Sequence, residues 1–264
     1  MGHVVCVAGQ RGGAGKTTTA INLSAAFAMA EKKSLLVDCD PRGYATAGMG
    51  IDTAEVPGGL YEAMTGKIPV KDLLIDSELP FLKMLPAGIE LARIETERMT
   101  EEGKEHILRD LIGDLSPSYD YITLDIASSL NLLAVNAIAA SDSLIIPFQC
   151  ELNALEELCR LLEILKELKE KFNRGIKIAG ILFTLFDREE RMAREIADAV
   201  RLHFNDMVYR TTIPKDDLVQ RSCQQGKPIF LTELTSVGAQ RYLELAEEFM
   251  NRWSPGVTGG ENTQ

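Results

Sequence analysis

The feature that most constrains the fold of this chain is a glycine-rich segment between an apolar run and a helical pattern. Val4–Ala8 is strand-like, residues 9–16 read Gly-Gln-Arg-Gly-Gly-Ala-Gly-Lys, and Thr17–Ala30 has the pattern of a helix. Glycines let consecutive backbone N–H groups turn inward as an anion nest, and a helix N-terminus adds the positive end of its dipole. This strand–loop–helix context favours a phosphate-binding loop over a turn that merely joins two elements.

Two side chains of this segment have the chemistry of a nucleotide site. Lys16 supplies a mobile positive charge for β- and γ-phosphates, and Thr17 supplies a hydroxyl for Mg²⁺. The ordinary motif G-x-x-x-x-G-K-[ST] requires glycine at position 10, where this chain has Gln10. The segment therefore predicts phosphate binding by an unusual variant of the loop.

Short apolar runs alternate with longer helical patterns along most of the chain. The predicted strands are Val4–Ala8, Ser34–Asp38, Leu82–Leu85, Tyr121–Ile126, Ser143–Phe148, Ile176–Phe186 and Met207–Ile213. The predicted helices are Thr17–Ala30, Thr100–Leu115, Leu132–Ala140, Ala154–Phe172, Arg188–Phe204, Asp217–Gln225 and Val237–Trp253. This alternation predicts an α/β fold, with a mostly parallel twisted sheet and helices on both of its faces.

The length of 264 residues, with 45% hydrophobic and 25% charged residues, is typical of one globular domain. We expect this single domain over residues 1–253 and a flexible C-terminal tail over residues 254–264. Residues 43–80 are the least regular stretch, and they predict a loop-rich excursion with short helices instead of a second domain.

The net charge and the cysteines limit where this protein can be located and which partners it can bind. The formal net charge of −11 excludes a chain-wide basic surface, so contact with nucleic acid would need a local patch. The five cysteines are scattered without a C-x-x-C pair, as expected for reduced thiols in a cytosolic protein. The first residues resemble a strand and not a signal peptide, and no apolar run is long enough to cross a bilayer. We therefore expect a soluble cytoplasmic protein that does not bind membranes.

Five segments, in the right order, resemble landmarks of one family. Residues 11–17 (RGGAGKT) are similar to the deviant Walker A loop K-G-G-x-G-K-T of the ParA/MinD superfamily. Residues 37–46 (VDCDPRGYAT) resemble its D-x-D-P-Q-G-N-A-T segment, and residues 119–125 (YDYITLD) resemble its Walker B strand. Residues 145–156 resemble P-x-Q-x-E-x-x-A-L-E, and residues 213–214 with 226–228 match its C-terminal landmarks. The resemblance is specific for the ParA/Soj-like group and implies a P-loop NTPase fold of the deviant Walker A type.

The resemblance implies an ATPase whose two protomers sandwich two ATP molecules, so that ATP binding produces a homodimer. Asp40 would orient or activate the attacking water, and Asp125 would hold Mg²⁺ through a water beside Thr17. The catalytic residues implied are Asp40, Lys16 and Arg11. The nucleotide-binding residues implied are Gly12, Gly13, Ala14, Gly15, Lys16, Thr17, Thr18 and Pro214. Independently, phosphoryl transfer needs a lysine, a metal and a carboxylate near the nucleophile.

The family also implies a cargo and partners. A ParB-like or other activating protein would stimulate slow hydrolysis, and the ATPase would position or partition DNA or a protein assembly. Non-specific DNA is a further candidate partner, through Lys215 and Arg221, in the segment after Pro214 that normally carries arginines. That segment here has the adjacent acids Asp216 and Asp217, which would repel phosphates, and Leu218 where an arginine is expected.

Two further departures concern the nucleotide site. The family's extra lysine, which crosses the dimer to the partner's nucleotide, is Arg11 here, and arginine differs from lysine in reach and geometry. The family's T-P-P after the Walker B aspartate is Ile126-Ala127-Ser128, which frees the backbone of that loop.

These departures leave a second function open: a nucleotide-dependent regulatory switch that binds a protein, hydrolyses weakly and does not bind DNA. A nitrogenase-type reductase would need cysteines that converge on an iron–sulfur cluster, and no convincing ligand motif is present. A MinD-like membrane ATPase would end in a basic amphipathic helix, whereas the last helical pattern here is flanked by acids.

Overall fold

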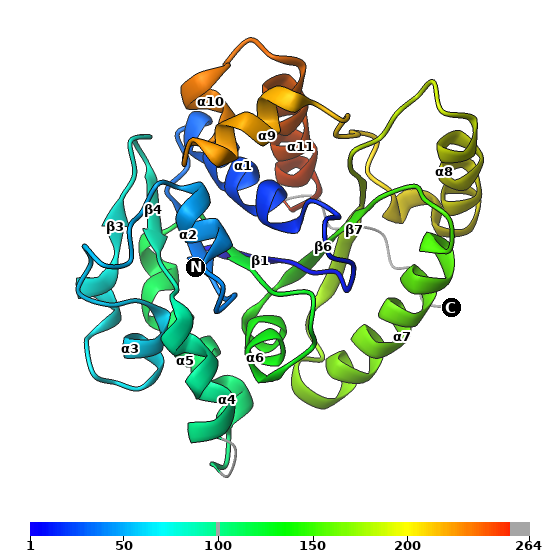
Figure 1. The fold of residues 1–264 in the computed structure, drawn as a ribbon. Helices are drawn as coiled ribbons and strands as arrows, with labels where there is room; N and C mark the ends of the chain where they lie inside the picture. Colours follow the sequence, from blue (N-terminus) through cyan, green and yellow to red (C-terminus); the bar gives the residue numbers. More distant parts are fainter. Residues whose placement is uncertain (99–100, 254–264) are drawn as a thin grey trace.

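The computed structural model describes residues 1–98 and 101–253, which form one central sheet between two helical layers (Figure 1). In this described part, seven strands lie in the order β3-β4-β2-β5-β1-β6-β7, and every pair is parallel except β3 with β4. The strands are β1 (His3–Val7), β2 (Ser34–Asp38), β3 (Ile75–Asp76), β4 (Leu82–Leu85), β5 (Tyr121–Asp125), β6 (Ser143–Phe148) and β7 (Lys177–Phe183). The predicted α/β fold class is confirmed.

Helices cover both faces of the sheet. The longer ones are α1 (Lys16–Met29), α5 (Ile107–Leu115), α6 (Leu132–Ala140), α7 (Ala154–Phe172), α8 (Arg191–Phe204), α9 (Asp217–Gln224) and α11 (Val237–Trp253). The short ones are α2 (Tyr44–Gly48), α3 (Leu60–Met64), α4 (Ile94–Glu97) and α10 (Ile229–Thr232), with 3-10 turns η1 (Val70–Leu73), η2 (Ile89–Arg93), η3 (Lys104–His106), η4 (Ser116–Ser118) and η5 (Asn205–Met207). Apolar side chains of α1, α2 and α9–α11 pack on one face, and those of α3–α8 pack on the other.

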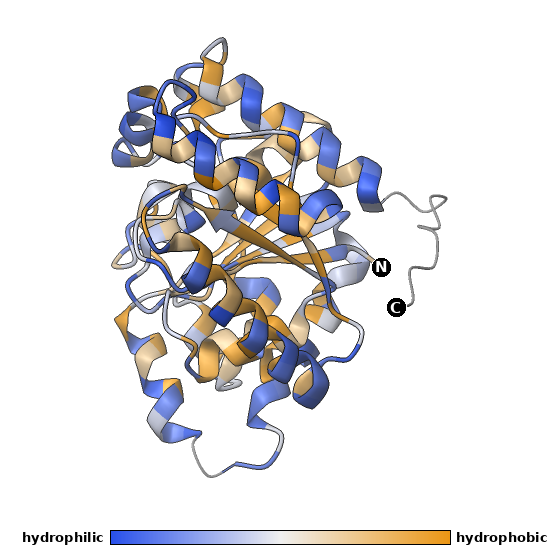
Figure 2. Ribbon diagram, turned by 90° about the vertical axis from the view of Figure 1, so that its right-hand side faces the viewer, coloured by the Kyte–Doolittle hydropathy of each residue, from blue (hydrophilic) through white to orange (hydrophobic). Residues whose placement is uncertain are grey.

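The central strands are largely apolar because both of their faces are buried. In β1, Val4 and Cys6 belong to the core under α3–α8, whereas Val5 and Val7 belong to the core under α1 and α11. Successive side chains of a strand point to opposite faces, so each strand of this kind contributes to two cores. Figure 2 shows the strands in orange at the centre of the molecule and helices with mixed orange and blue faces around them.

The prediction of a strand over Met207–Ile213 is wrong. Val208 forms only an isolated bridge with Ile181. The backbone N–H groups of Arg210 and Thr211 donate to the carboxylate of Glu248 on α11, both at 2.9 Å. These groups are therefore not available to a sheet neighbour, and the segment stays extended beside β7 without becoming a strand.

Other differences lie at the ends of elements. Helix α5 begins at Ile107, later than the predicted start at Thr100, which lies outside the described residues. The short edge strand β3 was not predicted, because two residues are too few for a pattern of alternation. The short helices expected within residues 43–80 are present as α2 and α3. The tail prediction for residues 254–264 concerns residues outside the described part.

Two glycines bring the turn after α2 into contact with the turn after α9. A Cβ atom on Gly50 would lie 2.8 Å from the carbonyl oxygen of Gly226, and a Cβ atom on Gly226 would lie 2.6 Å from the Cα atom of Gly50. Both glycines also have left-handed backbone angles, with φ values of 73° and 70°. The two turns therefore meet backbone to backbone, with no room for a side chain.

Candidate functional site

The polar residues that the sequence singles out follow three adjacent strands of the sheet. The glycine-rich loop follows β1, Asp38 ends β2, and Asp125 ends β5. In the parallel register, Asp125 lies opposite both Val7 of β1 and Asp38 of β2. The carboxyl ends of these strands therefore bring the loop and the carboxylates together, at the edge where open α/β sheets hold their ligands.

The glycine-rich loop has the backbone geometry of an anion-binding turn. Gly13 and Gly15 are left-handed, with φ values of 81° and 79°. Helix α1 begins at Lys16 without a side-chain cap, so the N–H groups of its first turn are left for a ligand. Thr184 lies just after β7. Its hydroxyl donates to the carbonyl oxygen of Ala14 at 2.9 Å, and this hydrogen bond ties the loop to the end of β7.

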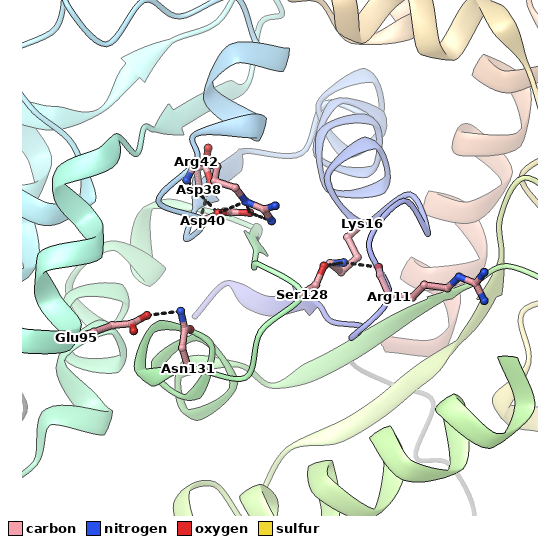
Figure 3. A network of polar contacts seen from close by, with 8 residues as sticks. All are labelled: Arg11, Lys16, Asp38, Asp40, Arg42, Glu95, Ser128 and Asn131. Atoms are coloured by element: carbon pink, nitrogen blue, oxygen red, sulfur yellow. Dashed lines mark hydrogen bonds and ion pairs between the residues drawn. The ribbon is translucent and has the colours of Figure 1, made fainter. Parts of the chain in front are cut away.

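Lys16 lies beneath this loop and is only 7% exposed. Its Nζ atom donates to the carbonyl oxygen of Arg11 at 2.9 Å and to the hydroxyl of Ser128 at 2.8 Å (Figure 3). Burial lowers the pKa of Lys16, and the negative charge of Asp125 opposes this effect. The ammonium group is thus held in place by neutral oxygen atoms, which an anionic phosphate can replace.

Asp125 has the surroundings expected of a carboxylate that holds a hydrated cation. It is fully buried, and among the described residues neither of its oxygens has a hydrogen-bond partner. Burial raises its pKa well above the usual range, and the charge of Asp38 adds to this effect. The nearby hydroxyl of Thr17 favours its charged form, although its geometry falls short of a hydrogen bond. Asp125 and Thr17 fit Mg²⁺, which keeps several waters and prefers oxygen ligands.

Asp38 organises the loop after β2. Its carboxylate accepts from the backbone N–H and the hydroxyl of Thr46, both at 2.8 Å, and from the backbone N–H of Asp40 at 3.0 Å. Burial raises the pKa of Asp38 to about 6, although the hydrogen bonds from Thr46 and Asp40 oppose this. Asp38 therefore fixes the start of α2 and the position of Asp40.

Asp40 is 2% exposed and is paired with Arg42, two residues further on the same turn. The guanidinium Nε atom lies 3.1 and 3.2 Å from the two carboxylate oxygens, and Nη2 lies 2.7 Å from Oδ2. The backbone N–H of Arg42 also donates to Oδ1 at 3.0 Å. Both oxygens of the predicted water-orienting carboxylate are therefore occupied (Figure 3).

Arg11 extends away from Lys16 and toward the start of α7. Its guanidinium forms a hydrogen-bonded ion pair with Glu151, and Nη1 lies 3.6 Å from a carboxylate oxygen of Glu157. The Arg11 side chain is 33% exposed. In the single chain, Arg11 is therefore engaged by two acids on the surface that flanks the loop.

A cavity of about 760 Å³ lies between the loop, α2 and α9. It is lined by four of the predicted nucleotide-binding residues of the loop and by Pro214: Gly13, Gly15, Thr17, Thr18 and Pro214. Tyr44 of α2 and Lys215 also line the cavity. Its lining does not include Lys16, Asp40 or Asp125, because Lys16 is held under the loop and Arg42 covers Asp40. The volume is adequate for a nucleotide.

Comparison with known proteins agrees with this geometry. A family model described as an AAA domain matches residues 2–178. The chromosome partitioning protein ParA of Myxococcus xanthus is 40% identical over 255 residues, which are 97% of this chain and 90% of that protein. The chain belongs to the ParA/Soj-like ATPases of the ParA/MinD superfamily. The sporulation initiation inhibitor protein Soj of Bacillus subtilis is 38% identical and is covered to 98% of its length.

The solved structures agree with the fold of a ParA/Soj-like ATPase. Cobyrinic acid a,c-diamide synthase from Mycobacterium smegmatis, with a bound ATP analogue and magnesium, superposes with a TM-score of 0.86 at 28% identity and covers 97% of both chains. The predictions of an ATPase and of ATP with Mg²⁺ are confirmed at the level of the family. Within residues 1–98 and 101–253, no helix has the length and hydropathy to span a membrane.

The candidate DNA residues of this ParA/Soj-like chain lie before α9 (Lys215) and in its last turn (Arg221). Lys215 and Arg221 are both exposed. Asp216 caps α9, because its carboxylate accepts from the N–H groups of Leu218 at 2.8 Å and of Gly238 at 2.9 Å. Leu218 packs against the core beneath α1 and α11. Two of the three residues that depart from the family here, Asp216 and Leu218, are therefore structural. The third, Asp217, is exposed and leaves a negative charge on this surface.

Sequence reasoning missed several residues of the site. Ser128 was seen only as a lost proline, but it accepts from Lys16, and its place just after the Walker B strand was the available signal. No motif marks Arg42 as the ion-pair partner of Asp40, although it stands only two residues further along the chain. Glu151 and Glu157 hold Arg11 from about 140 residues away in the chain, a distance over which no local pattern operates.

Proposed function

We propose that this ParA/Soj-like chain binds ATP with Mg²⁺, dimerises on the bound nucleotide and hydrolyses it slowly in the cytoplasm. The observation that carries the proposal is Asp125, a buried carboxylate without a hydrogen-bond partner among the described residues, beside Thr17 and Lys16 under a phosphate-binding loop. A hydrated Mg²⁺ would balance this charge, and Lys16 would move from the Arg11 carbonyl and Ser128 to the phosphates. Asp40 would orient the attacking water.

The cargo and partner complete the proposal. A ParB-like or other activating protein would stimulate hydrolysis, and the cycle would position or partition DNA or a protein assembly. Relatives named as chromosome partitioning proteins support this proposal. Non-specific DNA would contact Lys215, just before α9, and Arg221, in the last turn of α9, which are both exposed.

The second candidate function is a nucleotide-dependent switch that binds a protein, hydrolyses weakly and does not bind DNA. Asp217 favours it, since an exposed acid lies between the two candidate DNA residues Lys215 and Arg221. The pairing of Asp40 with Arg42 also favours it, because a carboxylate with both oxygens occupied is a poor base.

A DNA shift separates the two functions. With ATP at low salt, we expect the protein to retard non-specific duplex DNA, and with ADP we expect no retardation, because only the dimer presents two copies of the weak patch. Lys215→Ala with Arg221→Ala should abolish the ATP-dependent shift. Arg221 is not among the residues that line the cavity, so Arg221→Ala alone should weaken the shift without changing nucleotide affinity. Arg109→Ala on α5 is the matched control, since it removes an exposed arginine far from this patch. If ATP produces no shift at low salt while slow turnover persists, the protein-binding switch is the better description.

Arg11 provides the test of dimerisation. We expect Arg11→Ala to weaken the dimer formed with a non-hydrolysable ATP analogue about tenfold, because a charge-assisted contact to the partner's nucleotide is lost. Sedimentation velocity over a range of protein concentrations measures this change. Arg11→Lys restores the residue of the family motif and should recover most of the affinity.

The ion pairs of Arg11 with Glu151 and Glu157 make this test specific to the dimer. They lie within one chain and are partly exposed, so their loss should change the melting temperature little. If Arg11→Ala dimerises like the unchanged protein, Arg11 does not reach the nucleotide of a second copy.

A further inference from the structure

The turn after β2 contains an arginine whose position the proposed function does not use. Asp40 is buried, but the Arg42 side chain that covers it is 53% exposed. The turn is tight, because the backbone N–H of Gly43 donates to the carbonyl oxygen of Asp40 at 2.8 Å. The pair is therefore local in sequence, with an exposed guanidinium on a buried carboxylate, so the guanidinium can reach a second anion while Asp40 needs a new partner once it leaves.

A second side chain supports this arginine. The Cζ atom of Arg42 lies 4.7 Å from the centre of the Tyr44 ring, and Tyr44 lines the cavity together with Gly15 and Thr17. The ParA segment that residues 37–46 resemble, D-x-D-P-Q-G-N-A-T, has Gln and Asn where this chain has Arg42 and Tyr44. The two departures contact each other, so the chain has replaced two neutral polar residues by a guanidinium that lies against an aromatic ring of the cavity lining.

Arg42 also lies on the side of Asp40 that faces the phosphate-binding loop. Figure 3 shows its guanidinium directed toward the side on which Lys16 lies. Burial lowers the pKa of Lys16, the charge of Asp125 opposes this effect, and the charge of Arg42 adds to it. Two cations that influence each other across a gap create a field that attracts an anion between them.

We propose that Arg42 is a specificity-determining residue that distinguishes a nucleoside triphosphate from a diphosphate. Without a γ-phosphate it holds both oxygens of Asp40; a γ-phosphate competes for the guanidinium, and Asp40 is released to orient water. The inference rests on the proposed ATPase function, because it assigns Asp40 to hydrolysis. Arginine suits this exchange, since its planar fork matches carboxylate and phosphate oxygens equally well. Tyr44 lies against the guanidinium and limits its movement.

Calorimetric titration tests the assignment without any hydrolysis. Mg-ADP and the magnesium complex of a non-hydrolysable ATP analogue are titrated into the unchanged protein and into Arg42→Gln, which restores the family residue. We expect Arg42→Gln to weaken the triphosphate about tenfold and to leave the diphosphate within about twofold, because only the triphosphate gains the guanidinium. Arg241→Gln is the matched control, since Arg241 forms a similar short-range pair with Glu244 on α11 and should change neither affinity.

A second variant should change the affinity for the triphosphate in the opposite direction. Asp40→Asn removes the competitor of the γ-phosphate, so we expect the triphosphate to bind several-fold more tightly, about the value of one weakened ion pair, with the diphosphate unchanged. Combined with Arg42→Gln, the gain should disappear. If the gain persists in the double variant, it comes from lost repulsion between Asp40 and phosphate, and the inference is wrong.

The outcomes separate this inference from the proposed function. If the unchanged protein binds neither nucleotide, the proposed ATPase function is wrong. If it binds both and Arg42→Gln weakens both equally or neither, the ATPase function stands and Arg42 does not distinguish them.

Discussion

Replacing Lys16 by alanine should remove the binding of Mg-ATP. We expect a loss of about 100-fold or more in affinity, because the variant lacks the only ammonium that lies beneath the described loop and leaves the charge of the phosphates without a buried counter-charge. Calorimetric titration of Mg-ATP and of Mg-ADP measures the effect directly. Both nucleotides should lose affinity, since both place a β-phosphate within reach of this residue.

The control for this prediction must keep the loop intact. Ser128→Ala removes one of the two oxygens that now hold the Lys16 ammonium, and it should leave nucleotide affinity within a few-fold. Lys166→Ala removes an exposed lysine of α7 and should change nothing. Circular dichroism verifies that each variant is folded. Tight ATP binding by a folded Lys16→Ala protein would show that the loop does not cradle a triphosphate.

The second large effect is expected at Asp40. Asp40→Ala should bind Mg-ATP at least as well as the unchanged protein but hydrolyse it about 100- to 10,000-fold more slowly, which is the usual contribution of a positioned general base. The carboxylate lies 2% exposed at the end of the β2 segment, where it is fixed by Asp38 through its backbone N–H. Single-turnover release of phosphate, measured beside an affinity titration, separates hydrolysis from binding.

Asp110→Ala is the matched control for Asp40, because Asp110 is an exposed acid on α5 far from the loop. It should hydrolyse ATP at the unchanged rate. An Asp40→Ala protein that turns over normally would remove this carboxylate from the reaction. A variant that loses ATP affinity together with turnover would instead assign Asp40 a role in the architecture of the turn.

The sheet was predictable because its strands are buried on both faces. The apolar runs Ser34–Asp38, Leu82–Leu85 and Ser143–Phe148 are strands with the predicted bounds. Periodicity could not predict that Met207–Ile213 fails to join the sheet. That outcome depends on Glu248 of α11, which is distant in the sequence. Its carboxylate accepts hydrogen bonds from two backbone N–H groups of this segment.

The site was predictable in its parts and not in its pairings. Sequence placed Lys16, Asp40 and Asp125 at the ends of neighbouring strands, because each ends or follows an apolar run. The contacts that these residues make could not be predicted from the sequence. Lys16 meets Ser128 from 112 residues away, and the orientation of Arg42 over Asp40 depends on the shape of a turn and on the ring of Tyr44. Such pairings arise from the tertiary structure, and the spacing of residues along the sequence does not predict them.

The contact between Gly50 and Gly226 has a mechanical consequence. Asp40 lies in the segment that leads into α2, and Lys215 lies in the segment that leads into α9, while the two helices end at turns whose main chains touch. No deformable side chain separates these turns to absorb a displacement. A shift of α2 would therefore be transmitted directly to α9, so that the segment of Asp40 and the segment of Lys215 are mechanically coupled.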